Sequence, residues 1–136
     1  MRLYFDEDIG KGIPEALRGV GFTDIVYPGR YHRPGKTPGR IDRGFKDSQW
    51  IPAVGSDGYL AVSYNYRMLD VDLERQLLKT NGVGIVFVMD GQEYGLNVLR
   101  LILRKWAWLE GLYDTEPRPF AYLLRMSGHT RRDYRV

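Results

Sequence analysis

The segment at residues 83–89 constrains the fold more than any other part of the sequence, because it is apolar almost without interruption. A half-buried strand alternates apolar and polar residues, whereas a continuous apolar run is typical of a strand covered on both faces. Strands buried in this way occur in parallel sheets that have helices on each side. The run therefore predicts a layered α/β protein.

Shorter apolar runs and helical patterns alternate along the rest of the chain. Strands are expected at residues 2–5, 23–27, 58–62 and 120–126, and helices at 11–21, from 47, from 70 or 72 to 78, and at 94–112. This alternation predicts a mainly parallel central sheet of four to five strands flanked by helices. The sequence shows no internal repeat and no linker, so residues 1–136 are expected to form a single domain.

The charges of the chain are unevenly distributed. There are 20 Lys and Arg residues against 17 Asp and Glu, but the cations concentrate in a Gly- and Pro-rich loop at residues 28–46 and in a C-terminal tail from residue 129. Such an asymmetry is typical of a protein that brings a polyanion to an acidic site, although a merely solvated loop is the alternative. The cations of the loop are Arg30, Arg33, Lys36, Arg40, Arg43 and Lys46.

The composition excludes several classes of site. The chain has no cysteine, which excludes disulfides, zinc–thiolate sites, iron–sulfur clusters and cysteine nucleophiles. Its two histidines, His32 and His129, argue against a multi-histidine metal site. No apolar run reaches the ~18 residues that span a membrane, and residues 1–8 lack the pattern of a secretory signal. We therefore expect a cytoplasmic protein with no membrane partner.

Polar residues follow three of the predicted strands at the point where each strand ends. They are Asp6, Glu7 and Asp8 after the first strand, Ser63 and Asn65 after the third, and Asp90 after the fourth. Ligands of open α/β sheets bind beyond the carboxyl ends of the strands, so we expect these residues to gather at one edge. Asp47, at the start of a helix, could join them. Oxygen ligands of this kind suit hard cations such as Mg²⁺ or Mn²⁺.

Each of these residues also has a role that involves no ligand. Asp6, Asn65 and Asp90 are common turn residues, Asp90 especially because a Gly follows it. Asp47 is nearly as well suited to cap its helix. Because side chains alternate along an extended chain, at most one of the two acids that follow Asp6 is expected to share a pocket with it.

Three segments together carry a resemblance to a known family. Residues 3–9 read Leu-Tyr-Phe-Asp-Glu-Asp-Ile and precede a Pro-containing helix, and residues 47–51 and 58–67 contain an Asp, a short helix, a buried strand and a Ser-x-Asn turn. In this order and spacing, over residues 2 to 126, the chain resembles small PIN-like domains related to the VapC-type toxin ribonucleases. Arg118-Pro119-Phe120, before the last strand, also resembles the VapC-like subgroup.

The resemblance implies a Mg²⁺- or Mn²⁺-dependent ribonuclease, the toxin of a VapBC-type toxin–antitoxin pair. The ligands that it implies are Asp6 from the first strand, Asp47 from the middle helix, Asn65 from the turn and, at a looser spacing, Asp90. The family usually has Asp where Asn65 stands and Thr where Ser63 stands, so the site loses one negative charge. Asp8 or Glu7 would compensate for it.

The resemblance also implies partners. The substrate would be RNA, with the basic loop contacting phosphates and Arg67, just past the turn, neutralising the phosphate that is cut. A cognate antitoxin protein would neutralise the enzyme. The surface around Trp106, Trp108 and Tyr113 is a candidate for that interface or for a homodimer.

Two other functions stay open at this point. A catalytically weakened PIN-like module would bind RNA or protein without cutting, because Asn65 is neutral. A haloacid-dehalogenase-like phosphatase would use Asp6 and Asp8 as its Asp-x-Asp pair, with Ser63 in its second motif, but the chain is short for that fold and Asp90 lacks a partner acid.

Overall fold

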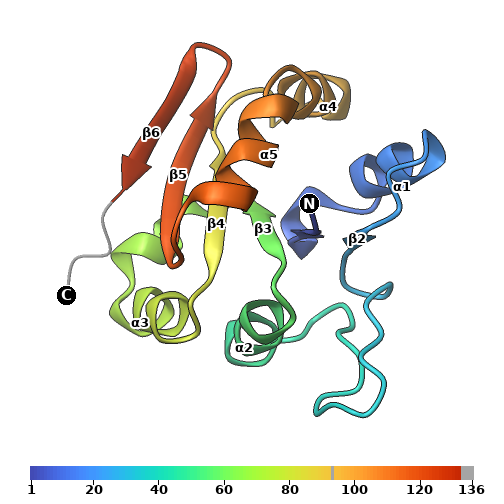
Figure 1. Ribbon diagram of the computed structural model, residues 1–136, viewed down its shortest axis with the longest axis vertical. Helices are drawn as coiled ribbons and strands as arrows, with labels where there is room; N and C mark the ends of the chain where they lie inside the picture. Colours follow the sequence, from blue (N-terminus) through green and yellow to red (C-terminus); the bar gives the residue numbers. More distant parts are fainter. Residues whose placement is uncertain (93, 133–136) are drawn as a thin grey trace.

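The computed structural model describes residues 1–92 and 94–132. Its centre is a six-stranded sheet with the order β2-β1-β3-β4-β5-β6 (Figure 1). The strands are β1 (Leu3–Phe5), β2 (Ile25–Val26), β3 (Leu60–Ser63), β4 (Gly84–Val88), β5 (Phe120–Arg125) and β6 (Gly128–Arg132). The first five run parallel, and β6 pairs antiparallel with β5. The predicted α/β class with a mainly parallel sheet is confirmed.

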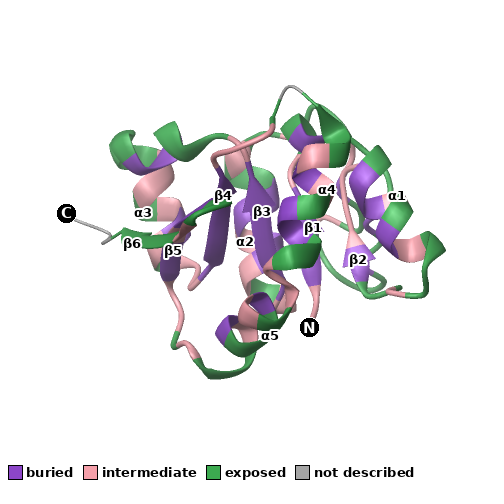
Figure 2. Ribbon diagram, turned by 90° about the horizontal axis from the view of Figure 1, so that it is seen from above, coloured by how far each residue is buried: buried purple, intermediate pink, exposed green. Residues whose placement is uncertain are grey.

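Helices cover both faces of the sheet. They are α1 (Gly12–Gly19), α2 (Asp47–Asp57), α3 (Asp72–Thr80), α4 (Gly95–Arg104) and α5 (Trp106–Thr115), with short 3-10 turns η1 (Glu7–Ile9) and η2 (Tyr66–Asp70). The helices α1, α4 and α5 pack on one face, and α2 and α3 pack on the other. Figure 2 shows the consequence, with β1, β3 and β4 buried and the outer sides of the helices exposed, whereas the edge strand β6 is largely exposed.

The alternation of side chains along β1 divides the core into two clusters. Leu3 and Phe5 belong to the cluster under α1, α4 and α5, whereas Tyr4 belongs to the cluster under α2 and α3. As predicted, β4 is buried throughout, because helices lie on both of its faces. The parallel strands β1, β3 and β4 all point the same way, so their carboxyl ends form one edge, which is called the acidic edge below.

The helices α2 and α3 approach each other closely at Gly55. A Cβ atom at this position would lie 2.2 Å from the carbonyl oxygen of Asn81, just after α3, so only glycine permits the contact. Gly58 ends α2 in the left-handed conformation, with φ of 75°. This packing sets the position of α2, whose first residue is Asp47, against α3.

The basic loop at residues 28–46 contains no helix and no regular strand, as predicted, but it is folded against the sheet. Tyr31 and Ile41 are buried in the cluster under α2 and α3. The Tyr31 hydroxyl donates to Asp57 Oδ2 at 2.6 Å, and Arg33 Nε donates to the same oxygen at 2.7 Å. The end of α2 therefore anchors the loop.

The prediction of one helix at residues 94–112 is wrong. The segment forms α4 and α5, which are separated at Lys105, where φ is −96° and ψ is 10°. The change of direction lets Trp106 pack edge-on against Phe22, with ring centroids 4.7 Å apart, while Leu109 and Leu112 remain in the core.

Residues 129–132, which belong to the segment predicted as a basic tail, form part of β6. The strand pairs with β5 and is held by stacking of Trp108 on His129, with centroids 4.2 Å apart, and by an ion pair of 2.9 Å between Arg131 and Glu116. The sheet therefore has six strands instead of four to five. Residues 133–136 of the predicted tail lie outside the described residues.

Within the described part of the chain, no helix combines the length and the apolar character that crossing a membrane requires.

Candidate functional site

The acidic edge begins with a carboxylate pair that one serine bridges. The pairing of Phe5 with Val62 places the next residues of the two strands, Asp6 and Ser63, side by side. The Ser63 hydroxyl lies 3.0 Å from Asp6 Oδ2 and 3.3 Å from Asp8 Oδ2. Ser63 is fully buried, so its single proton is shared between two carboxylates and fixes their separation.

The electrostatics of this pair favour a proton. Burial, together with the charges of Asp8 and Asp47, raises the pKa of Asp6 to about 7, although hydrogen bonds from the Glu7 N–H and from Ser63 oppose the rise. Burial also raises the pKa of Asp8, against hydrogen bonds from the Tyr64 N–H and Ser63. The carboxylates at this edge would therefore attract a cation strongly.

A second carboxylate pair joins α2 and α3. Asp47, at the first position of α2, accepts a hydrogen bond of 2.8 Å from Trp50 Nε1. Glu74, in the first turn of α3, shares a hydrogen bond with Asp47, and burial and then the charge of Asp47 raise the pKa of Glu74. Glu74 is not among the predicted site residues, because an acid in the first turn of a helix is ordinarily explained by the helix dipole.

Tyr4 lies beneath these two pairs. Its side chain is 0 % exposed, and it points to the same sheet face as Asp6, two residues along the strand. Its ring stacks on Trp50 with centroids 5.0 Å apart. Burial, and then the charge of Asp6, raise the pKa of Tyr4, so the phenol keeps its proton.

The hydroxyl of Tyr4 is the one buried side-chain oxygen or nitrogen among the described residues that has no hydrogen-bond partner. Leaving such a group unsatisfied costs about 1–3 kcal/mol. Orphaned groups of this kind occur where a water molecule or an ion belongs. The hydroxyl is therefore an available donor next to the acids.

The acidic residues suit a hard divalent cation. Among the residues that the structure describes, no three His, Cys, Asp or Glu side chains converge into a complete ligand set. Mg²⁺, however, is usually held by one or two carboxylates together with waters and substrate phosphates. Two carboxylate pairs, a raised pKa at Asp6 and an unpartnered hydroxyl fit such a water-rich site.

The remaining predicted site residues that follow strands or turns are Asn65, Arg67 and Asp90, and they lie outside the two carboxylate pairs. Asn65 is exposed, and its backbone N–H donates to the Ser63 hydroxyl at 3.0 Å. Arg67 is exposed in η2. Asp90 accepts a hydrogen bond of 2.8 Å from the backbone N–H of Met126, at the turn between β5 and β6. The structure thus joins Asp6 with Asp8 and Asp47 with Glu74, and it bonds Asp90 to the turn between β5 and β6.

Glu7 is turned away from the acid pair and toward the basic loop. Its carboxylate accepts a hydrogen bond of 3.0 Å from the Gly44 N–H and pairs with Arg43 at 3.5 Å. This contact places the end of the basic loop next to the acidic edge.

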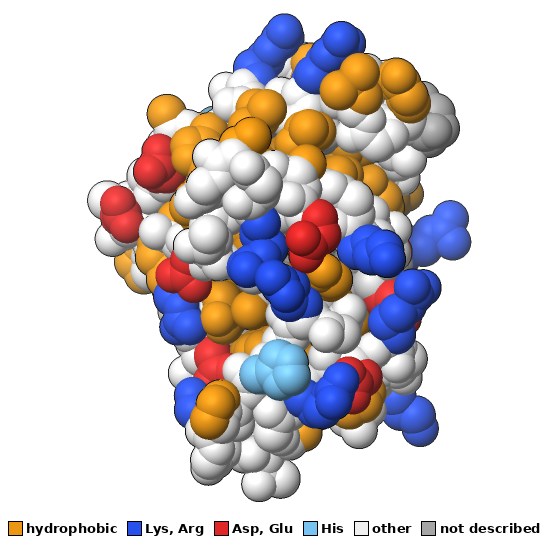
Figure 3. Space-filling model, turned by 90° about the vertical axis from the view of Figure 1, so that its right-hand side faces the viewer, with side chains coloured by type: hydrophobic (Ala, Val, Ile, Leu, Met, Phe, Trp, Pro, Cys, Tyr) orange, Lys and Arg blue, Asp and Glu red, His pale blue; other side chains and the backbone are white. Residues whose placement is uncertain are grey.

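The cations of the basic loop differ in their availability. Arg33 is 5 % exposed and is committed to Asp57 and to the carbonyl oxygen of Pro38, so it offers no free charge to a phosphate. Lys36 also pairs with Asp57 but is half exposed. The others lie on the surface, where Arg30, Arg40 and Arg43 have acidic neighbours and Lys46 is exposed. Figure 3 shows Lys and Arg side chains, with acidic ones among them, over this face of the molecule.

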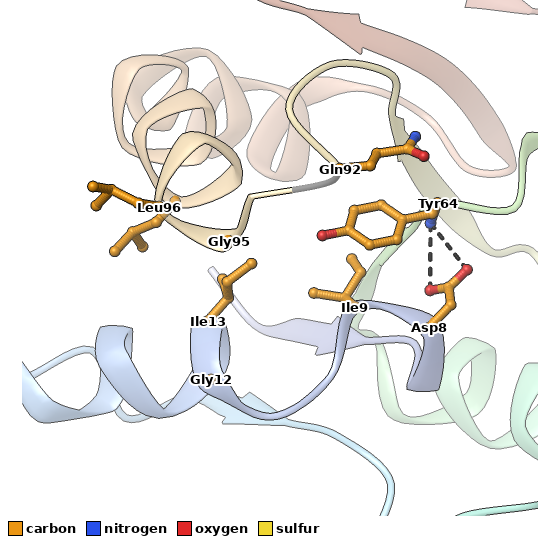
Figure 4. Close-up of a pocket in the computed structure, with 9 residues that line it drawn as sticks. Asp8, Ile9, Gly12, Ile13, Tyr64, Gln92, Gly95 and Leu96 are labelled. Atoms are coloured by element: carbon orange, nitrogen blue, oxygen red, sulfur yellow. Dashed lines mark hydrogen bonds between the residues drawn. The ribbon is translucent and has the colours of Figure 1, made fainter.

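A pocket of about 510 Å³ opens on the other side of the acid pair. Asp8 forms part of its wall, and the Tyr64 ring lies inside it, while the Tyr64 backbone N–H donates to Asp8 at 3.2 Å (Figure 4). The acidic edge is therefore bordered by a basic loop on one side and by a hollow on the other.

Comparison with known proteins gives one finding. A family model described as a PIN-like domain matches residues 1–90, which include both carboxylate pairs and the basic loop. No curated protein and no solved structure matches the chain significantly. PIN-like domains have a nuclease-type fold, and the match favours this class over the phosphatase alternative. The VapC-type subgroup stays a prediction. The match covers well over half of the chain, and the chain therefore belongs to the PIN-like domain family.

Proposed function

We propose that this protein is a metal-dependent endoribonuclease that hydrolyses RNA phosphodiesters, and that it acts as the toxin of a VapBC-type toxin–antitoxin pair. The observation that carries the nuclease proposal is the Asp6–Ser63–Asp8 group at the carboxyl edge of a PIN-like sheet, with Asp47 and Glu74 beside it. A nuclease-type fold supplies the reaction class, and the oxygen-only side chains supply the cation preference.

Asp6 and Asp47 would hold Mg²⁺ or Mn²⁺, with Asp8 and Glu74 as their neighbours. When bound, such a cation supplies positive charge to the phosphate and acidifies a water molecule. The protein's own residues have distinct tasks. Ser63 keeps Asp6 and Asp8 in a fixed orientation, and the proton that Asp6 holds near neutral pH without a cation would leave when the cation binds.

The basic loop would hold RNA against the acidic edge through its surface cations. Glu7 ties the loop to the turn that carries Asp6 and Asp8, through the Gly44 N–H and Arg43. A strand of RNA bound along the loop would therefore reach the carboxylates. Arg67, exposed just past the turn, would neutralise the phosphate next to them.

A second candidate function is supported by one residue. Asn65 places a neutral amide where this class of turn usually carries an Asp, which lowers the negative charge available to a cation. In this alternative the protein binds RNA or a partner protein without cutting.

The nuclease proposal is tested by cleavage of a labelled single-stranded RNA in Mn²⁺ or Mg²⁺. Wild type should cut, EDTA should abolish the activity, and both Asp6→Ala and Asp47→Ala should lower it strongly. Asp114→Ala, an exposed acid on α5, is the matched control. Binding of the RNA without cleavage would instead favour the weakened module.

The toxin role needs a separate experiment. Expression of wild type should arrest growth, and the product of the adjacent gene should rescue it. The apolar groove lined by Val20, Phe22, Leu103 and Trp106 is a candidate surface for that antitoxin, because Val20 and Leu103 are largely exposed. Arrest without rescue by a neighbouring gene would argue for a nuclease outside such a pair.

A further inference from the structure

The pocket beside the acid pair has a composition that suits a flat, uncharged group. Its apolar walls come from Ile9 in η1, Ile13 in α1, and Leu96 and Leu99 in α4. In Figure 4 the Tyr64 ring reaches into the space between these helices. The volume of about 510 Å³ lies within the roughly 300–1,000 Å³ that is usual for sites of small ligands.

The polar groups of the pocket are few and placed at its edges. Gln92 donates through Nε2 to the carbonyl oxygen of Val88, which fixes its amide and leaves Oε1 as an acceptor. The lining includes no Lys or Arg, and Asp8 is its one charged residue among those described. This chemistry disfavours a phosphate inside the pocket and favours a neutral ring.

The pocket is continuous with the proposed reaction site. Asp8 belongs both to the pocket wall and to the pair bridged by Ser63, and the backbone of Tyr64 is bonded to Asp8. A ligand with one part at Asp6 and Asp8 would therefore place its next part in the pocket. In a strand of RNA, the neutral ring next to a phosphate is a nucleobase.

The mouth of the pocket is open for such a group. Gly12 and Gly95 begin α1 and α4 and line the pocket, and a Cβ atom added at either position would meet nothing within 4 Å. The two glycines therefore leave free space beside the first turns of both helices.

We propose that this pocket binds a single unstacked nucleobase of the RNA, adjacent to the phosphate at the acidic edge, with Tyr64 as its stacking partner. The inference rests on the proposed ribonuclease function and extends it to substrate selection. Gln92 Oε1 would accept from an exocyclic amino group, while the Tyr64 ring would stack on the face of the base. Recognition of splayed bases by aromatic stacking and edge contacts is general in RNA binding.

The first test measures base binding without catalysis. Adenosine, guanosine, cytidine and uridine are each titrated into ¹⁵N-labelled protein in EDTA. We expect saturable shifts of the backbone signals of Tyr64, Gln92 and Leu96, with one base preferred. Tyr64→Leu should weaken binding by about fivefold or more, the lower limit for loss of base stacking. Tyr122→Leu, the same change on β5, should leave binding within about twofold of wild type.

The second test uses cleavage. Gln92→Met keeps the side-chain length and removes the amide, so it should alter which nucleotide flanks the cut while Mn²⁺ affinity stays unchanged. The two proposals fail differently. Nucleoside binding without RNA cleavage overturns the nuclease and leaves the base pocket standing. Cleavage by a wild type that binds no nucleoside, with Tyr64→Leu and Gln92→Met unaltered in site preference, overturns the base pocket alone.

Discussion

Replacing Asp6 with Asn should stabilise the protein in the absence of a divalent cation, and increasingly so as the pH rises. The carboxyl has a pKa of about 7 in the folded protein, against 3.8 without its surroundings. An acid whose pKa is higher in the folded state binds its proton more tightly there, so folding loses stability as the pH rises from about 4 to about 7. Above this window the penalty stays constant.

The size of the effect follows from the shift. About three pH units at 1.36 kcal/mol each give a penalty of about 4 kcal/mol above pH 7, of which roughly 2–3 kcal/mol develops between pH 5 and pH 8. Asn relieves the penalty and keeps the local contacts, because its oxygen can still accept from the Glu7 N–H and its amide can donate to Ser63.

Urea unfolding of wild type and Asp6→Asn in EDTA, across this pH range, measures the difference. The two free energies of unfolding should diverge with rising pH, and Asp114→Asn, at an exposed acid, should follow wild type. Mg²⁺ should then stabilise wild type more than Asp6→Asn, because the cation replaces the proton. If the free energies of unfolding of wild type and Asp6→Asn ran parallel with pH, Asp6 would not be a buried acid that neighbouring acids repel.

Four further substitutions test other parts of the structure. Tyr4→Phe removes a hydroxyl without a partner, so metal-free stability should rise by about 1–3 kcal/mol in urea unfolding, and a loss of stability would reveal a missed bond. Asp57→Ala should cost about 3–5 kcal/mol, because it leaves Arg33 buried and unpaired; a cost near zero would contradict the anchoring of the loop. Glu74→Gln should weaken Mn²⁺ binding measured by calorimetry, and unchanged affinity would place this carboxyl outside the site. Asn65→Asp should tighten Mn²⁺ binding in the same assay, and unchanged affinity would place this side chain outside the site.

Residues that obey a general rule of the fold were predictable from sequence. Because parallel strands end at one edge, the position of Asp6 next to Ser63 follows once the strands are recognised. The buried strand β4 was visible in its unbroken apolar run. In these cases one local pattern determines the outcome.

Residues whose roles depend on distant partners were not predictable. Arg33 reads like the other cations of its loop, and only Asp57, 24 positions away, explains its burial. Glu74 looks like an ordinary acid at a helix start until α3 packs on α2. The strand β6 is polar and exposed along most of its length, so its pairing with β5 has no apolar signature.

Binding of Mn²⁺ tests the central claim most directly, because the metal site underlies both the proposed reaction and the placement of RNA. Free Mn²⁺ is measured by electron paramagnetic resonance as it is titrated into wild type, Asp6→Asn, Asp47→Asn and the control Asp114→Asn. Wild type and the control should show a saturable site, and this site should be strongly weakened in both of the other variants. Folded wild type that binds no Mn²⁺, or variants that bind it as wild type does, would contradict a metal centre at the acidic edge.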